Sequence, residues 1–332
     1  GVSGERRLVV DARGFVVRED ELKASRPGPD LKLTIDAPLQ IFVERVLRGE
    51  KGACVIMNPR SGAVLAMASA PSYNLNSFVP FLSNEVYHSV TNNPDMPLLN
   101  RASGCLYPPG SIFKPITAVA AIECGIDPAE THYCYGSYEL GTMTLRCARR
   151  WGHGELNLYQ ALRDSCNPYF AAAAMKIGTN LLSRTARKFG LGRRTGIDFP
   201  VDAAGNVPDG QVNEARNERW YAGELLLTAI GQGKLLVTPL QMAVYAGALG
   251  TGVLCTPRIN VSTPVSVREL DVPKSHLEHI QKGLRLVVLQ RGTGSKANDG
   301  LNAFVIGKKW ALVTAAGKTP GSSPTHAPTR RR

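Results

Sequence analysis

The spacing of apolar residues predicts a strand hairpin early in the chain. Residues 53–57 and 63–67 are apolar runs of strand length, and residues 58–62 between them are rich in turn formers. Ahead of this hairpin, Asp36 can cap a helix of about three turns that ends at Gly49.

Helical periodicity dominates the middle of the chain. A largely apolar helix is predicted from about residue 111 to residue 124, where Gly125 ends it. Further helices are predicted at about 157–164, 168–177, 180–189, 222–230, 239–249 and 275–288, and a last strand at 313–319. A hairpin first, helices between and a strand near the end predict an α/β (α+β) fold. We expect both chain ends to contribute to one sheet, without parallel βαβ alternation.

Composition divides the chain into three parts. Residues 1–31 are charged and contain Gly and Pro, which predicts the end of a preceding non-catalytic segment and a linker. Residues 32–319 carry the periodic patterns and form the main domain. Residues 320–332 have the composition of a disordered tail.

The charge of the chain is strongly positive, at +12 over 332 residues, but it is dispersed. A nucleic-acid binder would show a basic stripe interleaved with aromatic residues, so we expect no nucleic-acid partner.

No window supplies the roughly 18 consecutive apolar residues of a membrane span. Seven cysteines in a chain of this length do not form a disulfide scaffold.

The main candidate for chemistry is Ser111, three residues before Lys114 at the start of the apolar helix. Positions three apart share a helix face, so the lysine amine can reach the serine hydroxyl. A serine needs such a base to become a nucleophile, and burial would keep Lys114 neutral. Ser-x-x-Lys alone is also common as a helix cap followed by a solvated lysine.

Two later motifs complete a three-part signature. Ser165 and Asn167 lie in a loop, where the serine can relay protons and the amide can hold Lys114; alternatively, Asn167 caps the next helix. Lys318 and Thr319 offer a cation and a hydroxyl for a peptide carboxylate. Three such motifs in this order are the signature of penicillin-recognising serine acyltransferases.

With these motifs, the chain resembles the transpeptidase domain of class B penicillin-binding proteins, in particular the elongation-type penicillin-binding protein 2 group. The likeness runs from about residue 6 to residue 319 and includes residues 33–36, 57–62, 107–115, 152–154, 196–198, 231–233 and 236–241. It implies an antiparallel sheet with helices on both faces, and makes residues 32–319 a transpeptidase domain.

The resemblance also implies a reaction that requires no cofactor. Ser111 would attack the penultimate D-alanine carbonyl of a peptidoglycan stem peptide, and an amine of a neighbouring stem would take the acyl group. β-Lactams would acylate the same serine, and Gly321 would supply one oxyanion donor. The resemblance further implies a membrane glycosyltransferase partner and tethering at the periplasmic face of the inner membrane.

The chain departs from the family pattern near its end. Lys-Thr-Gly is replaced by Lys318-Thr-Pro-Gly, and proline removes a backbone donor from a strand. Only residues 320–332 follow Thr319, so we expect a fold that is incomplete at the C-terminus. A second hypothesis is therefore an inactive or binding-only penicillin-fold protein. A third, a serine β-lactamase, lacks a motif for the deacylating base.

Four metal-ligand residues converge on the Ser165 loop. They are Cys134, Cys147, His153 and Cys166, a set suited to tetrahedral structural zinc. Their spacing matches no common zinc finger. A Cys134–Cys147 disulfide and a set of unlinked thiols beside a core histidine remain open alternatives.

Overall fold

Both ends of the chain contribute to one antiparallel sheet. The computed structural model describes residues 1–79, 82–210, 221–289, 292–295 and 311–316. The sheet has the order β11-β3-β4 and comprises β3 (Gly52–Met57), β4 (Val64–Ala70) and β11 (Ala311–Ala316). In the strand register, Val55 of β3 pairs with Met67 of β4 on one side and with Val313 of β11 on the other. The predicted hairpin and the joining of the chain ends are confirmed. The last strand covers 311–316 rather than 313–319, whose final three residues lie outside the described part.

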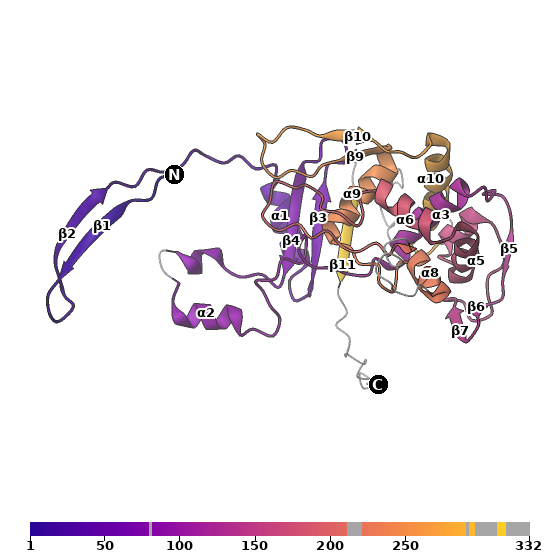
Figure 1. Ribbon diagram of the computed structural model, residues 1–332, viewed down its shortest axis with the longest axis horizontal. Coiled ribbons are helices and arrows are strands. Elements are labelled where there is room, and N and C mark those ends of the chain that lie inside the picture. The colour runs from indigo at the N-terminus through magenta and orange to yellow at the C-terminus, as the bar shows by residue number, and fades with distance from the viewer. Residues whose placement is uncertain (80–81, 211–220, 290–291, 296–310, 317–332) are drawn as a thin grey trace, which may run out of the picture.

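Helices pack on both faces of this sheet, as expected. Helix α1 (Ala37–Val46) packs on β4, and α9 (Pro239–Thr251) packs on β3 and β11 from the other side (Figure 1). Because side chains alternate along a strand, Val55 faces the large core while Cys54 joins Val43 of α1 in a smaller cluster. Asp36 caps α1, accepting a hydrogen bond from Leu39 N at 3.0 Å.

The helical region is built around α3 (Lys114–Glu123), whose residues 114–121 are all buried. Its neighbours include α5, α6 and α10. The helices of this region are α4 (Leu158–Arg163), α5 (Asn167–Ile177), α6 (Thr179–Lys188), α8 (Ala222–Ala229) and α10 (Lys274–Leu289). The predicted helices are therefore present, with ends shifted by a few residues. One difference matters for the site: the chain enters α3 through a 3-10 turn, η2 (Gly110–Phe113).

Short strand pairs lie at the end of the molecule opposite α1 (Figure 1). They are β5 (His132–Cys134) with β8 (Gly154–Leu156), and β6 (Ser137–Leu140) with β7 (Met143–Arg146). A further pair, β9 (Val253–Cys255) with β10 (Val267–Glu269), lies near α9 and α10. Cys134 is the last residue of β5, and Cys147 directly follows β7.

Two segments project from the sheet. The hairpin of β1 (Glu5–Val10) and β2 (Val16–Lys23) extends away from the rest (Figure 1). The second lies within residues 71–79 and 82–100 and contains η1 (Leu75–Phe78) and α2 (Asn84–Thr91). The start of α2 is stabilised by the Ser83 hydroxyl, which accepts a hydrogen bond from Val86 N at 3.2 Å.

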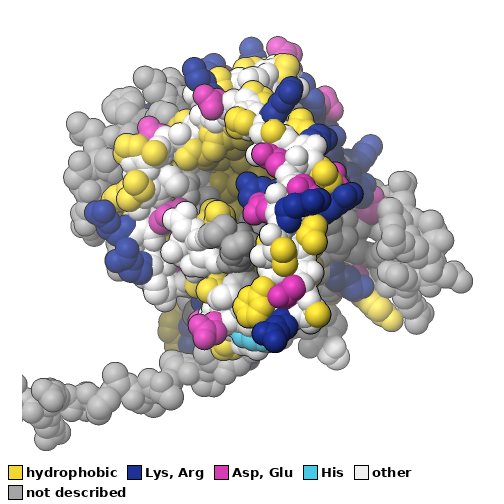
Figure 2. Space-filling model, turned by 90° about the vertical axis from the view of Figure 1, so that its left-hand side faces the viewer, with side chains coloured by type: hydrophobic (Ala, Val, Ile, Leu, Met, Phe, Trp, Pro, Cys, Tyr) yellow, Lys and Arg dark blue, Asp and Glu magenta, His cyan; other side chains and the backbone are white. Residues whose placement is uncertain are grey.

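Basic side chains are dispersed over the surface, as their positions along the sequence predict. On the face shown in Figure 2, Lys and Arg side chains are scattered among Asp and Glu rather than gathered in one stripe. Among the described residues, no helix combines the length and apolar character that crossing a bilayer requires.

Candidate active site

Ser111 is exposed at a helix entrance that is fixed from several sides. Gly110 N donates to Gly231 O at 2.7 Å, and Tyr245 Oη donates to the carbonyl of Ile112 at 3.1 Å. Gly231 has φ +76°, and a Cβ there would lie 2.0 Å from Gly110 O, so only glycine fits. These contacts hold the backbone on both sides of Ser111.

Lys114 lies one turn further, with only 2% of its surface exposed. Its Nζ donates to Ser165 O at 2.7 Å, to Ser165 Oγ at 2.8 Å and to Asn167 Oδ1 at 2.7 Å. The ring of Phe170 lies 5.7 Å from the same nitrogen. Burial lowers the pKa of the Lys114 amine to about 8, and the Cys166 and Cys147 thiols oppose this shift. About a tenth of the amine is therefore neutral at pH 7, far more than for an exposed lysine.

The loop that receives Lys114 has an unusual backbone. Ser165 has φ +52°, a left-handed conformation that a serine adopts only when its surroundings impose it. This conformation directs both the carbonyl and the hydroxyl of Ser165 to Lys114. Asn167 Nδ2 donates to Arg146 O at 2.9 Å, which fixes its Oδ1 toward the amine. Cys166, not Asn167, is the N-cap of α5, so the alternative capping role for Asn167 is wrong.

Lys114 makes these three hydrogen bonds within the described part of the chain, and none goes to Ser111 Oγ. Two of its acceptors are carbonyl oxygens, Ser165 O and Asn167 Oδ1, and these can only accept. A neutral amine has two N–H groups, which would go to these oxygens. Its lone pair would then face a hydroxyl, either that of Ser165 or that of Ser111. This is the arrangement that a base needs in order to accept a proton.

The other residues predicted for the active site lie outside the part of the chain that the structure describes. Lys318, Thr319 and Gly321 follow the end of β11 at Ala316. Residues 320–332, predicted as a tail, lie there as well. Their predicted roles stay predictions.

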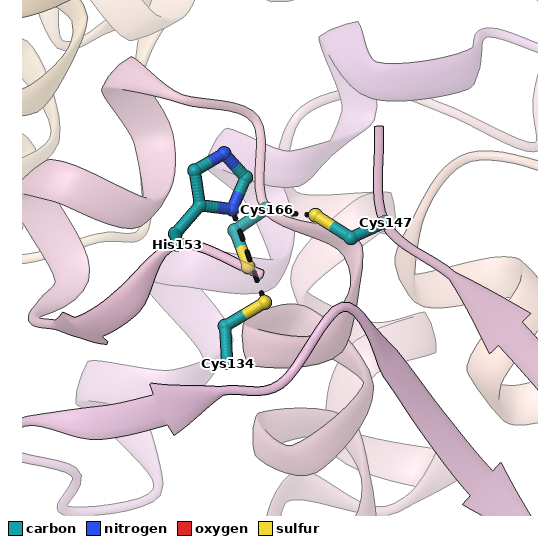
Figure 3. Close-up of side chains that lie close together, drawn as sticks. All are labelled: Cys134, Cys147, His153 and Cys166. Carbon is teal, nitrogen blue, oxygen red and sulfur yellow. Dashed lines mark hydrogen bonds between the residues drawn. The ribbon is translucent and has the colours of Figure 1, made fainter. Parts of the chain in front are cut away.

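The four residues predicted as metal ligands come together beside the Lys114 amine and its acceptors Ser165 and Asn167. The ligand atoms of Cys134, Cys147, His153 and Cys166 all lie within 4.8 Å of one another (Figure 3). His153 Nδ1 is 3.3 Å from Cys147 Sγ and 3.8 Å from Cys134 Sγ. All four side chains converge on one point from the β5, β7 and β8 ends and the start of α5. Three sulfurs and one imidazole at this spacing fit a tetrahedral ion, with its Zn–S bonds of about 2.3 Å.

Electrostatics within this Cys/His cluster differ from one thiol to the next. Burial opposes ionisation of Cys134, but hydrogen bonds from the His153 and Gly136 backbone bring the pKa of its thiol below the usual value. Burial raises the pKa of the Cys166 thiol. All seven cysteines are free in the structure, including the Cys134–Cys147 pair that the disulfide alternative would join.

Some functional contacts were not predicted from the sequence. The carbonyl of Arg146, which fixes Asn167, belongs to a distant strand and carries no side-chain signal. The role of Gly231 against Gly110 was also missed. A glycine in a Gly-x-Gly motif indicates a special backbone position, but the motif does not show what approaches it.

Comparison with known families decides the lineage. Residues 52–319 match the penicillin binding protein transpeptidase domain. The chain belongs to this family. The match begins at β3, so it covers the sheet, the helical region and the residues around the Lys114 amine.

Several curated relatives share this transpeptidase domain. The peptidoglycan D,D-transpeptidase MrdA of Escherichia coli strain K12 is 34% identical over 281 residues, which are 83% of this chain and 44% of the relative. The MrdA of Haemophilus influenzae is 35% identical over 326 residues, covering 93% of this chain and 50% of the relative. The chain therefore spans about half the length of the curated relatives it matches.

Solved structures of penicillin-binding protein 2 are also similar. The Helicobacter pylori protein has a TM-score of 0.83 and 30% identity, covering 93% of this chain and 64% of that one. The Pseudomonas aeruginosa protein has a TM-score of 0.79 and 30% identity, covering 87% of this chain and 74% of that one. The predicted family and fold, including the elongation-type group, are confirmed.

Proposed function

We propose that this chain is the catalytic module of a peptidoglycan D,D-transpeptidase. The observation that carries the proposal is the buried Lys114 amine, with its lowered pKa and three fixed acceptors, one turn after the exposed Ser111. The relatives named as peptidoglycan D,D-transpeptidases support the same reaction. The substrate is a stem peptide ending in D-Ala-D-Ala.

In this proposal Ser111 is the nucleophile and Lys114 its base. The Ser111 hydroxyl loses its proton to the neutral Lys114 amine as Oγ attacks the penultimate D-alanine carbonyl. The proton then passes through Ser165 Oγ to the leaving D-alanine amine. An amine of a neighbouring stem then attacks the acyl carbonyl and the ester bond to Ser111 Oγ breaks. The proton that the amine loses returns to Ser111 Oγ through Lys114, and the new amide is the cross-link. Asn167 holds Lys114, while Lys318, Thr319 and Gly321 bind the donor carboxylate and the oxyanion.

A fluorescent penicillin tests this chemistry directly. We expect one covalent label per chain, lost in Ser111→Ala and retained in Ser262→Ala, a matched change at an exposed loop serine. Fast release of the label would instead point to a β-lactamase. Absence of label on the parent chain would favour the inactive or binding-only alternative, which the Lys318-Thr-Pro-Gly sequence motivates.

We also propose that Cys134, Cys147, His153 and Cys166 hold a structural zinc ion. The convergence of their four ligand atoms within 4.8 Å supports this, and catalysis itself would require no cofactor. The ion would brace the loop on which Cys166 separates Ser165 from Asn167. Elemental analysis should find about one zinc per chain, lost in Cys147→Ser and kept in Cys105→Ser. No zinc, with two thiols missing from an Ellman titration, would favour the Cys134–Cys147 disulfide.

We place the chain at the periplasmic face of the inner membrane, in the machinery of cell elongation. One similar solved structure is a complex between penicillin-binding protein 2 and MreC from Helicobacter pylori, and another is of a peptidoglycan synthase complex. By this analogy a membrane glycosyltransferase is the expected partner. Co-purification of this protein with a membrane glycosyltransferase tests the assignment.

We propose that residues 1–31 belong to a preceding non-catalytic segment and that the transpeptidase domain comprises residues 32–319. The β1–β2 hairpin, whose strands pair with each other, supports this division. Limited proteolysis should cleave between residues 24 and 32 and leave the remaining domain able to bind penicillin.

A further inference from the structure

Three exposed aromatic side chains occur at the end of the molecule that carries β5 to β8. Tyr133, Tyr135 and Trp151 are 53%, 76% and 85% exposed, and the last two are the most exposed large apolar side chains of the described residues. We call these three residues the aromatic platform. The rings of Tyr133 and Tyr135 adjoin each other, and contiguous exposed apolar surface marks interaction sites.

The rings are ordered by their neighbours. The centroids of Tyr133 and Tyr135 lie 4.4 Å apart at an interplanar angle of 41°. The guanidinium of Arg150 lies 5.4 Å from the ring of Trp151. Arg149 and Arg150 are exposed and form no salt bridge with any residue that the structure describes. Exposed aromatic rings thus occur together with two arginines that have no acidic partner among the described residues.

The two turns that carry the platform are in direct backbone contact. A Cβ at Gly136 would lie 2.1 Å from Arg150 O, and one at Gly152 would lie 1.9 Å from Cys134 O. Both glycines have positive φ values, which only glycine adopts without strain. The segment with Tyr135 and the segment with Trp151 therefore pack directly against each other as one unit.

The same unit positions Asn167, one of the acceptors of the Lys114 amine. Cys147 N donates to Gly136 O at 2.8 Å, and the adjacent Arg146 carbonyl accepts the hydrogen bond from Asn167 Nδ2. Cys134, at the base of the platform, converges with Cys166 between Ser165 and Asn167 (Figure 3). The platform is thus continuous with the loop that holds the proposed base.

We propose that the aromatic platform binds the glycan strand of peptidoglycan. This inference rests on the proposed function, because the stem peptide extends from that strand. Sugar rings present faces of C–H groups that pack on aromatic rings, whose faces carry negative charge. Arg149 and Arg150 complement the carboxylates of this acidic polymer. The platform would hold the strand while its peptide enters the site at Ser111.

Binding of peptide-free glycan strands, released from purified sacculi by an amidase and fluorescently labelled, tests the platform. By fluorescence anisotropy, Trp151→Ala and Tyr135→Ala should each weaken binding about threefold to tenfold. Trp151→Phe should retain most of the affinity because it keeps a ring. Phe42→Ala is the matched control, since Phe42 is 60% exposed on α1, which lies beside the sheet and away from β5 to β7 (Figure 1).

Penicillin labelling of Ser111, measured on the same samples, separates the two proposals. Labelling at the parental rate with weakened glycan binding supports the platform and shows that the variants are folded. Unchanged glycan binding in both alanine variants, or no binding by the parent chain, overturns it. If the parent chain sediments as an oligomer and Trp151→Ala sediments as a monomer, a second copy of the chain occupies the platform. That result would also overturn the proposal. Absence of penicillin label in the parent chain counts against the proposed function alone.

Discussion

Lys114 Nζ lies 2.7 Å from Asn167 Oδ1, and this contact joins the first turn of α3 to the first residue of α5. Asn167 is fixed in turn by the Arg146 carbonyl. A buried ammonium needs acceptors, and here they come from a loop that the metal-ligand cluster also contacts. The geometry of the proposed base therefore depends on residues more than fifty positions away in the sequence.

The pH dependence of acylation should follow the neutral fraction of Lys114. The folded pKa is about 8, and the neutral form, which is the base, predominates above it. The acylation rate by penicillin should rise about tenfold per pH unit below pH 8 and level off above it. Stopped-flow labelling from pH 5.5 to 9.5 measures the profile. Lys114→Arg should lower the rate by about 100-fold or more, since a guanidinium is not deprotonated. A rate independent of pH over this range contradicts the assignment.

Asn167→Asp should shift this profile upward. A carboxylate beside Lys114 favours the ammonium form, so the midpoint should rise by about one to two pH units. The acylation rate at pH 7 should fall accordingly and recover at higher pH. Asn167→Ala serves as the comparison, because it removes the acceptor without adding charge. An unshifted midpoint in the aspartate variant would show that Lys114 is not the titrating base.

Gly231→Ala should destabilise the protein and displace Ser111. The new Cβ would lie 2.0 Å from Gly110 O at φ +76°, so the backbone must move. We expect a loss of about 2–4 kcal/mol in the free energy of unfolding and slower acylation. Gly252→Ala is the matched control: it has the same φ, but its nearest contact is a Leu277 methyl at 3.6 Å. That variant should lose only about 1 kcal/mol and acylate at the parental rate, as thermal melts and labelling would show.

The sequence predicted Ser111 and Lys114 one turn apart at a helix start, and the structure has them in η2 and at the first residue of α3, because their spacing is local. Their roles as nucleophile and base stay predictions. The sequence did not predict where the amine points, since that depends on the left-handed Ser165 and on Arg146 from a distant strand. Asn167 before proline fits the usual capping pattern, and capping was an open alternative. The buried Lys114 amine instead takes up its side-chain oxygen, because an unpaired buried cation would cost more than a lost cap.

The fold was predictable to a similar extent. The β3–β4 hairpin follows from two apolar runs of strand length and the turn residues between them, all within about twenty positions. The pairing of β5 with β8 was not predicted, because each strand has three residues and their partner lies about twenty residues away. Short strands carry little periodicity, and tertiary contacts decide their partners. The ligand-type side chains of three cysteines and His153 nevertheless predicted a cluster, and its members lie on or beside these strands and loops.

The last prediction concerns Gln241, a buried amide on α9. Its Nε2 donates to Arg193 O and Ala204 O, both at 2.8 Å, and its Oε1 accepts from Thr238 N at 2.9 Å. Gln241→Glu would keep the shape but place an acceptor against two carbonyl oxygens. We expect a loss of about 2–4 kcal/mol in the free energy of unfolding, by urea titration at pH 8. Protonation of the new carboxyl restores one donor, so the loss should shrink as the pH falls toward 5. Gln232→Glu, at an exposed position, is the control and should change stability by less than about 0.5 kcal/mol. Equal stability of Gln241→Glu and the parent chain would contradict the role of this amide in holding the segment around residue 204 to α9.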